Sequence, residues 1–229
     1  ENSREKELQY IDLLYSHRVL GIVVCSHIGE TMEHLDSNCP LISFEREIAE
    51  NIPAVLCDNY QGGILAANRL FDAGCRNIAI FNPPTKENIP AYSREKAFMK
   101  CCEDKKISGR VVYTDRLAPL SEEFGNNILE LLKKNSDLDG IFATSDVMAA
   151  NIIRACKKMG KRVPEDISIV GFDDTWISTL TYPSITTIHQ PVREMCEYAI
   201  EAIVKKVKSE KVPSQVVFPV ELIDRESTK

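Results

Sequence analysis

The sequence predicts an α/β protein whose parallel sheets are covered by helices on both faces. Short runs rich in β-branched and apolar residues alternate along the chain with longer stretches of helical periodicity. The short runs are apolar almost throughout, which is typical of strands that are buried on both faces. Strands that alternate with helices in this way indicate a parallel, doubly wound sheet.

The apolar runs place the strands, and the helical stretches fall between them. The expected strands are residues 20–25, 40–43, 54–57, 77–81, 109–113, 140–143, 167–170 and 185–188. The expected helices are residues 1–17, 61–72, 92–104, 121–134, 146–159 and 191–209. Gly74 is expected to cap the helix 61–72, because glycine adopts the left-handed conformation with which many helices end. Since the chain opens on a helix that enters a strand at Leu20, we expect native sequence with a further strand before Glu1.

Composition narrows the class of protein. The 229 residues are 44% hydrophobic and 27% charged, as in ordinary globular domains. The 28 Lys and Arg residues are outnumbered by 34 Asp and Glu, for a net charge of −6, whereas a nucleic-acid-binding domain is normally basic. No apolar run approaches the roughly 18 residues of a membrane span. Eight scattered cysteines without a Cys-x-x-Cys pair favour a reducing compartment, and we expect a cytoplasmic protein.

Ligands of open parallel sheets bind beyond the carboxyl ends of the strands. The polar residues that follow the expected strands are Ser26-His27, residues 43–46, Asp58-Asn59-Tyr60, residues 83–94, Asp115-Arg116, Thr144-Ser145-Asp146 and residues 173–176. They combine carboxylates, an arginine, amides, hydroxyls and aromatic rings. This mixture suits a neutral polyhydroxyl ligand, because charged groups bind its hydroxyls and a ring covers an apolar face.

Motifs of enzymes and of cofactor binding are absent. The sequence has no Gly-x-Gly-x-x-Gly, no phosphate-binding Gly-x-x-x-x-Gly-Lys-Ser/Thr and no Gly-x-Ser-x-Gly, so we expect no catalytic residues and no cofactor. The four histidines, among them His34, lack ligand spacing, so no metal site is expected. Asp173 and Asp174 could be a catalytic pair, but adjacent side chains diverge, which favours one ligand-facing and one capping aspartate.

Each candidate also has a plain structural interpretation. Ser145 with Asp146 could simply cap the helix 146–159, whose far end carries lysines and Gly160. Arg94 could be a solvated helix residue, and Trp176 could be a packing residue. These alternatives remain open from the residues alone.

Several segments together resemble the effector-binding core of the LacI/GalR family of bacterial transcription regulators. They are Ile52-Pro53-Ala54-Val55, residues 58–63, residues 73–79, residues 93–98, residues 141–149, residues 163–174 and residues 183–188. The most specific is residues 163–174, which read VPEDISIVGFDD. The segments follow the family's order over almost the whole chain.

The resemblance implies two doubly wound parallel-sheet subdomains joined by three crossovers, with the effector between them. On this chain the N-terminal subdomain would comprise residues 1–74 and 190–211. The C-terminal subdomain would comprise residues 75–189 and 212–229. The family carries a helix-turn-helix DNA-binding segment ahead of this core, and that segment is not among these residues.

The resemblance also implies site residues. Arg94 matches the family arginine that binds effector hydroxyl or carboxylate groups, and Asp173 matches the aspartate that accepts from sugar hydroxyls. Ser145 stands where many members have Asn, and Asp146 follows it. Tyr60 could stack on a sugar ring. We expect Arg94 and Asp173 to serve ligand binding rather than folding.

The implied function is allosteric control of transcription. A small-molecule effector, expected to be a mono- or disaccharide, would favour one angle between the subdomains and so set the spacing of DNA-binding segments in a homodimer. The helix 146–159 is a candidate for the dimer interface, with burial in the core as the alternative. A sugar-binding protein of a transport system is the second interpretation, and an α/β enzyme is the third. Related cores also bind nucleobases or phosphorylated proteins.

Overall fold

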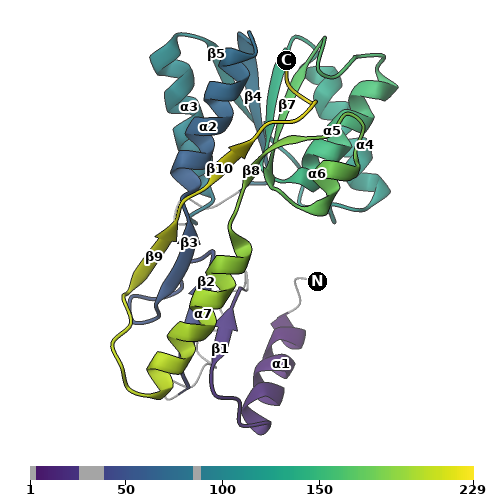
Figure 1. Cartoon of the computed structure of the whole chain (residues 1–229). Helices are drawn as coiled ribbons and strands as arrows, with labels where there is room; N and C mark the ends of the chain where they lie inside the picture. Colours follow the sequence, from purple (N-terminus) through teal and green to yellow (C-terminus); the bar gives the residue numbers. More distant parts are fainter. Residues whose placement is uncertain (1–3, 26–38, 85–88) are drawn as a thin grey trace. The chain divides into compact units, whose positions relative to one another are not determined.

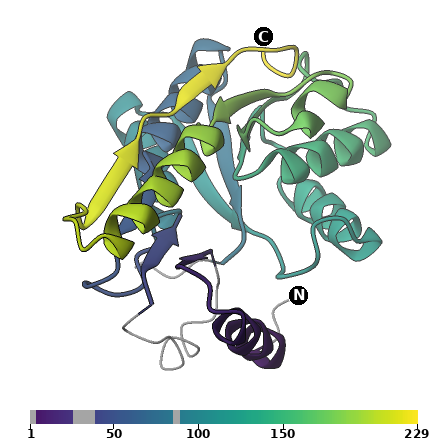
Figure 2. The ribbon, with the colours of Figure 1, turned by 60° about the horizontal axis from the view of Figure 1, so that its bottom comes forward.

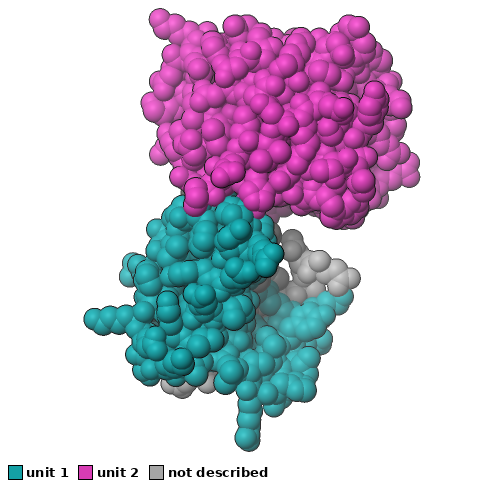
Figure 3. Space-filling model, viewed as in Figure 1, with its two compact units in different colours: residues 1–57, 191–218 teal, residues 58–190, 219–229 magenta. Residues whose placement is uncertain are grey.

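The computed structural model describes residues 4–25, 39–84 and 89–229 (Figure 1). The chain divides into two compact units, coloured separately in Figure 3. Unit 1 comprises Glu1–Cys57 and Pro191–Phe218, and unit 2 comprises Asp58–Gln190 and Pro219–Lys229. The chain therefore passes between the units three times, as the resemblance implied. Ser26, His27 and His34 lie outside the described residues.

Unit 1 is a parallel sheet with helices. Its elements are α1 (Arg4–Ser16), β1 (Ile22–Val24), β2 (Leu41–Phe44), β3 (Ala54–Cys57), α7 (Val192–Val207) and β9 (Gln215–Phe218). The strand order is β1-β2-β3-β9, and every neighbouring pair is parallel. Ile22, Leu41 and Ile52 form a small buried cluster. A β-carbon on Gly21 would lie 2.6 Å from Cγ2 of Ile203, so glycine allows α7 to pack closely against the chain entering β1.

Unit 2 is the larger of the two. Its strands are β4 (Asn77–Asn82), β5 (Ser108–Tyr113), β6 (Gly140–Ala143), β7 (Ser168–Asp173), β8 (Thr186–His189) and β10 (Glu221–Ile223). Its helices are α2 (Asn59–Asp72), α3 (Tyr92–Lys105), α4 (Glu122–Lys134), α5 (Asp146–Lys158) and α6 (Trp176–Leu180). The strand order is β10-β8-β7-β6-β4-β5. All pairs are parallel except β10 with β8, which is antiparallel.

The central strands of unit 2 are buried on both faces because successive side chains point to opposite sides of the sheet. Phe81 and Ile141 pack in the cluster that contains α4 and α5 residues. Phe142 stacks instead on Phe98 of α3, with ring centroids 5.9 Å apart. Helices α2 and α3 lie side by side, as do α4 and α5 (Figures 1 and 2). These contacts explain why the strand sequences are apolar without alternation.

The boundaries between the units differ from those implied by the resemblance. The helix assigned to the N-terminal subdomain through Gly74 belongs to unit 2, because α2 packs on α3 and on the unit 2 sheet. A β-carbon on Gly63 would overlap the carbonyl oxygen of Arg94, which shows how close α2 and α3 are. The terminal segment from Val212 is also divided, because β9 pairs with β3 in unit 1 and only β10 belongs to unit 2.

Three elements were not in the expected set. The terminal strands β9 and β10 were foreseen only as a strand region, and the antiparallel direction of β10 was not expected. Helix α6 has only five residues, too few to show helical periodicity. Among the described helices, none combines the length and apolar character that crossing a membrane requires.

Close packing of α2 on α3 predicts that Gly63→Ala destabilises the protein. The added β-carbon would meet backbone and would lie 2.9 Å from the β-carbon of Ala97. Overpacking of this kind costs about 1–3 kcal/mol, or about 2–12 °C in the midpoint of thermal unfolding. Gly125→Ala in α4 is the matched control, because its nearest neighbour would lie at 3.4 Å. Equal midpoints for the two variants would contradict this account of the helix contact.

Candidate site at the strand ends of unit 2

Polar side chains gather where the parallel strands of unit 2 end. Asn82 ends β4 and Asp173 ends β7, while Thr144 follows β6 and Gln190 follows β8. The carboxyl ends of parallel strands share one edge of a sheet, and ligands of such folds bind there. Helices α2 and α3 add residues from their first turns to this edge.

Arg94, in the first turn of α3, is buried, with 7% of its surface exposed. Its Nε donates a hydrogen bond to Oδ1 of Asn59 at 2.5 Å, and its Nη1 donates to the carbonyl oxygen of Thr144 at 3.2 Å. The guanidinium carbon lies 3.5 Å from the ring centroid of Phe172. A buried guanidinium is tolerated because hydrogen bonds and an aromatic face replace its hydration. Arg94 is therefore not the solvated surface residue of the alternative interpretation.

A chain of buried hydrogen bonds continues behind Arg94. The hydroxyl of Thr144 donates to Oδ1 of Asn82 at 3.2 Å, and Nδ2 of Asn82 donates to Oε2 of Glu95 at 3.1 Å. The Tyr113 hydroxyl donates to Oε1 of Glu95 at 2.9 Å. This hydrogen bond to Glu95 is the main cause that raises the pKa of the Tyr113 phenol above its ordinary value. These hydrogen bonds hold Thr144, whose carbonyl oxygen accepts from Arg94.

Asp173 lies at the end of β7 with a left-handed φ of 103°. Its Oδ1 accepts a hydrogen bond from Nε2 of Gln190 at 2.6 Å. Arg94 stacks on Phe172, the residue directly before Asp173. The structure thus brings the arginine and the aspartate predicted from sequence to the end of the same strand.

Ser145 and Asp146 have roles within the fold. Ser145 is the N-cap of α5, and its hydroxyl accepts from the backbone N–H of Met148 at 3.2 Å. Asp146 is fully buried, and its carboxylate accepts from the Thr187 hydroxyl at 2.6 Å and from the Thr175 backbone N–H at 2.6 Å. Burial raises the pKa of Asp146 above its ordinary value, although the hydrogen bonds from Thr187 and Thr175 oppose this effect. The structure thus places Asp146 inside unit 2 and not on a ligand-facing surface.

Tyr60 is the second residue of α2 and is 38% exposed. It follows Asn59, whose side chain accepts a hydrogen bond from Arg94, so the residue predicted to stack on a sugar ring lies at the start of the same helix. The carboxylate of Asp58 caps this helix by accepting from the backbone N–H of Gln61 at 2.8 Å.

Sequence reasoning missed three residues that shape the site. Asn59 was included among the polar residues after a strand but was not singled out. Phe172 was noted only as part of the segment 163–174 and Gln190 only as a subdomain boundary, and neither was proposed as a site residue. A β-carbon on Gly62 would lie 2.7 Å from the Phe172 ring, so α2 passes close to this ring. The glycine at position 62 is the feature of the sequence that could have pointed to a close approach here.

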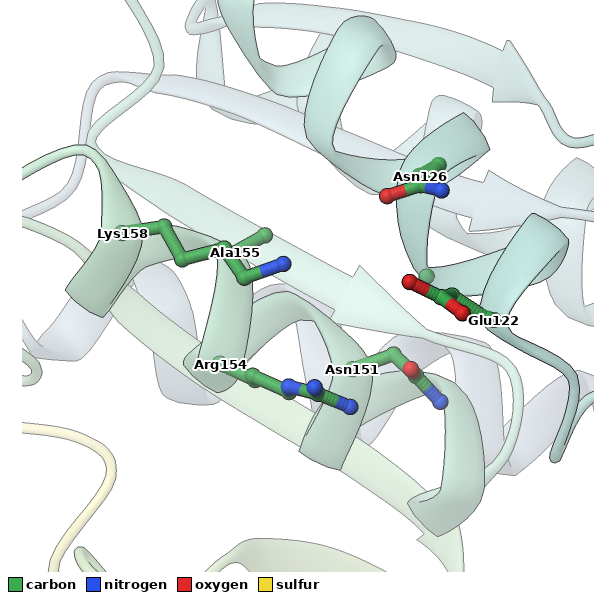
Figure 4. A pocket seen from close by; sticks show the side chains of 7 residues that line it. Glu122, Asn126, Asn151, Arg154, Ala155 and Lys158 are labelled. Carbon is green, nitrogen blue, oxygen red and sulfur yellow. The ribbon is translucent and has the colours of Figure 1, made fainter.

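A separate depression lies between α4 and α5 (Figure 4). Its lining residues are Glu122, Gly125, Asn126, Asn151, Arg154, Ala155 and Lys158. None of them belongs to the strand-end site. Within the described part of the chain, no three His, Cys, Asp or Glu side chains are grouped so that they could hold a metal ion.

Two units linked by three chain crossings, with a donor and an acceptor at the strand ends, define a small-molecule-binding core of the periplasmic-binding-protein type. The family model of the periplasmic binding protein-like domain matches residues 67–228. The chain belongs to this domain family, within the LacI/GalR transcription regulators. The family and fold predicted from the sequence are thereby confirmed.

Similar proteins agree with this assignment. The ribose operon repressor of Halalkalibacterium halodurans is 32% identical over 226 residues, which are 98% of this chain and 67% of the repressor. The sucrose operon repressor of Lactococcus lactis subsp. lactis is 29% identical over 224 residues, which are 97% of this chain and 68% of the repressor. A periplasmic binding protein/LacI transcriptional regulator from Alkaliphilus metalliredigens, solved in complex with D-xylulofuranose, is 33% identical with a TM-score of 0.85. That match covers 100% of this chain and 85% of the other.

The named relatives are repressors rather than enzymes or transport proteins. They favour the regulator over the sugar-binding transport protein that the sequence left as second interpretation, and over the enzyme left as third.

The contacts of Arg94 predict that it stabilises the fold, which differs from the expectation from sequence that Arg94 serves ligand binding rather than folding. Arg94→Met keeps much of the volume but leaves Asn59 and Thr144 without the guanidinium. We expect a loss of about 2 kcal/mol in the free energy of unfolding, or about 4–8 °C in the midpoint. Arg193→Met, at an exposed position of α7, is the control. Circular dichroism measures the midpoint of thermal unfolding for both variants. Equal midpoints would refute the structural role of Arg94.

Proposed function

We propose that this core senses a sugar, which binds against the strand ends of unit 2 between Arg94 and Asp173. The observation that carries the proposal is that a buried arginine and an aspartate both lie at the carboxyl end of β7. Arg94 offers a fixed guanidinium that is stacked on Phe172, and Asp173 follows Phe172 directly. A sugar hydroxyl both donates and accepts, so neighbouring groups of opposite kind recognise adjacent hydroxyls. Tyr60 would supply a ring for an apolar sugar face.

The chemical class we propose is a mono- or disaccharide, with pentoses as the first to examine. Two supports are independent of each other. The residues at the site are hydrogen-bonding and aromatic, with one arginine and one aspartate, which suits a neutral polyhydroxyl ligand better than a phosphorylated one. The similar proteins carry the names of ribose and sucrose, and one holds D-xylulofuranose.

We propose that the sugar acts through its different affinities for two arrangements of the units. An effector can shift such an equilibrium only by that difference in affinity. Operator DNA would then be bound by a helix-turn-helix segment outside these residues, in keeping with their net charge of −6. A cytoplasmic location is what this role requires, and it agrees with the eight scattered cysteines of the sequence.

We also propose a homodimer formed through α5 and α6. These helices pack on each other, and Trp176, Leu180 and Tyr182 are 71%, 73% and 92% exposed. Such exposed apolar side chains in one segment are typical of interaction surfaces. The neighbouring depression carries both signs of charge, with Glu122 on α4 and Arg154 on α5 (Figure 4). A patch with both signs is self-complementary under a two-fold axis.

The sugar proposal predicts a ligand-dependent rise in thermal stability. A sugar at about 100 times its dissociation constant adds about 2.7 kcal/mol, or roughly 5–10 °C in the midpoint. D-Ribose, D-xylulose and sucrose are tested by differential scanning fluorimetry, with glycerol as the control solute. Asp173→Asn should abolish the shift, and Glu122→Gln, in the depression of Figure 4, should keep it. A shift that survives Asp173→Asn would place the sugar elsewhere, and no shift with any sugar would overturn the class.

The dimer proposal predicts that a charge in the apolar segment of α6 separates the subunits. Leu180→Asp should change the sedimenting species from dimer to monomer, because the carboxylate would have to be buried without a partner. Ile200→Asp in α7, a similarly exposed position at 59%, should leave the mass unchanged. Sedimentation velocity measures both, and a wild-type chain that sediments as a monomer would overturn the proposal directly.

A further inference from the structure

The residue that ends β7 starts an unusual turn. Asp173 and Asp174 have φ values of 103° and 57°, in the left-handed region that residues with a β-carbon avoid. Other non-glycine residues of the described chain with positive φ occur singly, and these two are consecutive. Such conformations persist only where surrounding contacts impose them, and an observed outlier is a reason to look for function.

One set of contacts holds the carboxylate of Asp174. Its Oδ1 accepts from Nη2 of Arg225 at 2.6 Å and from the hydroxyl of Ser178 at 3.2 Å. Its Oδ2 lies 3.0 Å from Nδ1 of His189. Arg225 also donates to the carbonyl oxygen of Ile185 at 2.9 Å, which fixes the arginine itself. Burial alone would raise the pKa of Asp174, but Arg225 and the other hydrogen bonds outweigh it and hold this pKa below its ordinary value.

A second set of contacts holds the next residue, Thr175. Oδ2 of Asp146 accepts from both the backbone N–H and the hydroxyl of Thr175, at 2.6 and 3.1 Å. Oδ1 of Asp146 is anchored by the Thr187 hydroxyl at 2.6 Å. A β-carbon on Gly171 would lie 2.5 Å from this Oδ1, so the glycine provides the space that the carboxylate occupies.

We propose that Asp146 and Arg225 are positioning residues for Asp173, which impose the strained turn after β7 and thereby set the direction of the Asp173 carboxylate. This inference rests on the proposed function, in which Asp173 binds the sugar. Both residues act through neighbours. Asp146 is fully buried, and the side chain of Arg225 is 18% exposed and hydrogen-bonded to the protein. Gln190 then completes the orientation by donating to Asp173.

The alternative is that these contacts merely stabilise unit 2. The two explanations differ in what happens to the turn and to the sugar when one set of contacts is removed. A stabilising role would change global stability alone. A positioning role would change the local order of the turn and the affinity for the sugar.

The test is hydrogen–deuterium exchange on the ligand-free chain, read by mass spectrometry for a peptide that includes residues 174–176. Arg225→Gln should accelerate exchange in this peptide at least tenfold, while exchange in α2 stays unchanged. Arg110→Gln is the control, because Arg110 makes a similar 2.6 Å contact with Asp137 at the opposite edge of the same sheet. Wild-type exchange rates in Arg225→Gln would overturn the proposal.

A second variant guards against a folding defect. Asp174→Gly adopts the observed φ without steric cost but lacks the carboxylate that Arg225 holds. It should keep the thermal midpoint near that of the wild type and still accelerate exchange at residues 174–176. If Asp174→Gly keeps the wild-type exchange rate at residues 174–176, the turn does not depend on the contacts of the Asp174 carboxylate, and the proposal is overturned.

Sugar affinity gives the third measurement. The dissociation constant of the sugar identified by thermal shift should rise about tenfold in Arg225→Gln and Asp146→Asn and stay unchanged in Arg110→Gln. Faster exchange with unchanged affinity would overturn the positioning role. If the wild type binds none of the sugars, the proposed function fails. The exchange measurement still decides whether Arg225 imposes the turn after β7.

Discussion

The burial of the Arg94 guanidinium is the interaction on which the site of unit 2 depends. It joins Asn59 from the start of α2, the carbonyl oxygen of Thr144 after β6, and the ring of Phe172 in β7. These groups come from separate parts of the chain and meet only because α2 and α3 pack closely on each other and on the sheet. A charged group without these partners would be expensive to bury, so the packing and the polar contacts require each other.

The sequence is sufficient to predict central strands of both units. The strands 54–57 and 140–143 agree with β3 and β6 at both ends, because central strands of a covered sheet are apolar on both faces. The sequence is not sufficient to say which sheet a helix covers. The apolar stripe of α2 shows which of its residues are buried but not which sheet they pack against. The boundary between the subdomains was therefore expected after α2, at Gly74, whereas unit 2 begins before this helix, at Asp58. The direction of β10 likewise depends on a partner strand, β8, that is distant in sequence.

The same distinction applies to the site. Arg94 and Asp173 were predicted because a helix after one strand and the end of another strand are positions where ligands bind, and because a family motif marks them. The burial of Asp146 was not predicted, because a position after a strand does not say whether a side chain points outward or inward. Its partners Thr175 and Thr187 are 29 and 41 residues away in sequence. Asn59 reaches Arg94 across 35 residues, and no local pattern reports such a contact.

The position of two of these contacts along the chain has a mechanical consequence. The first passage from unit 1 to unit 2 falls between Cys57 and Asp58, and Asn59, which holds Arg94, is the second residue beyond it. The return passage falls between Gln190 and Pro191, and Gln190 is bonded to Asp173. Two of the three crossings between the units are therefore joined by a hydrogen bond to Arg94 or to Asp173. Because these hydrogen bonds lie within two residues of the crossings, a change of backbone angle at either crossing would shift a partner of Arg94 or of Asp173.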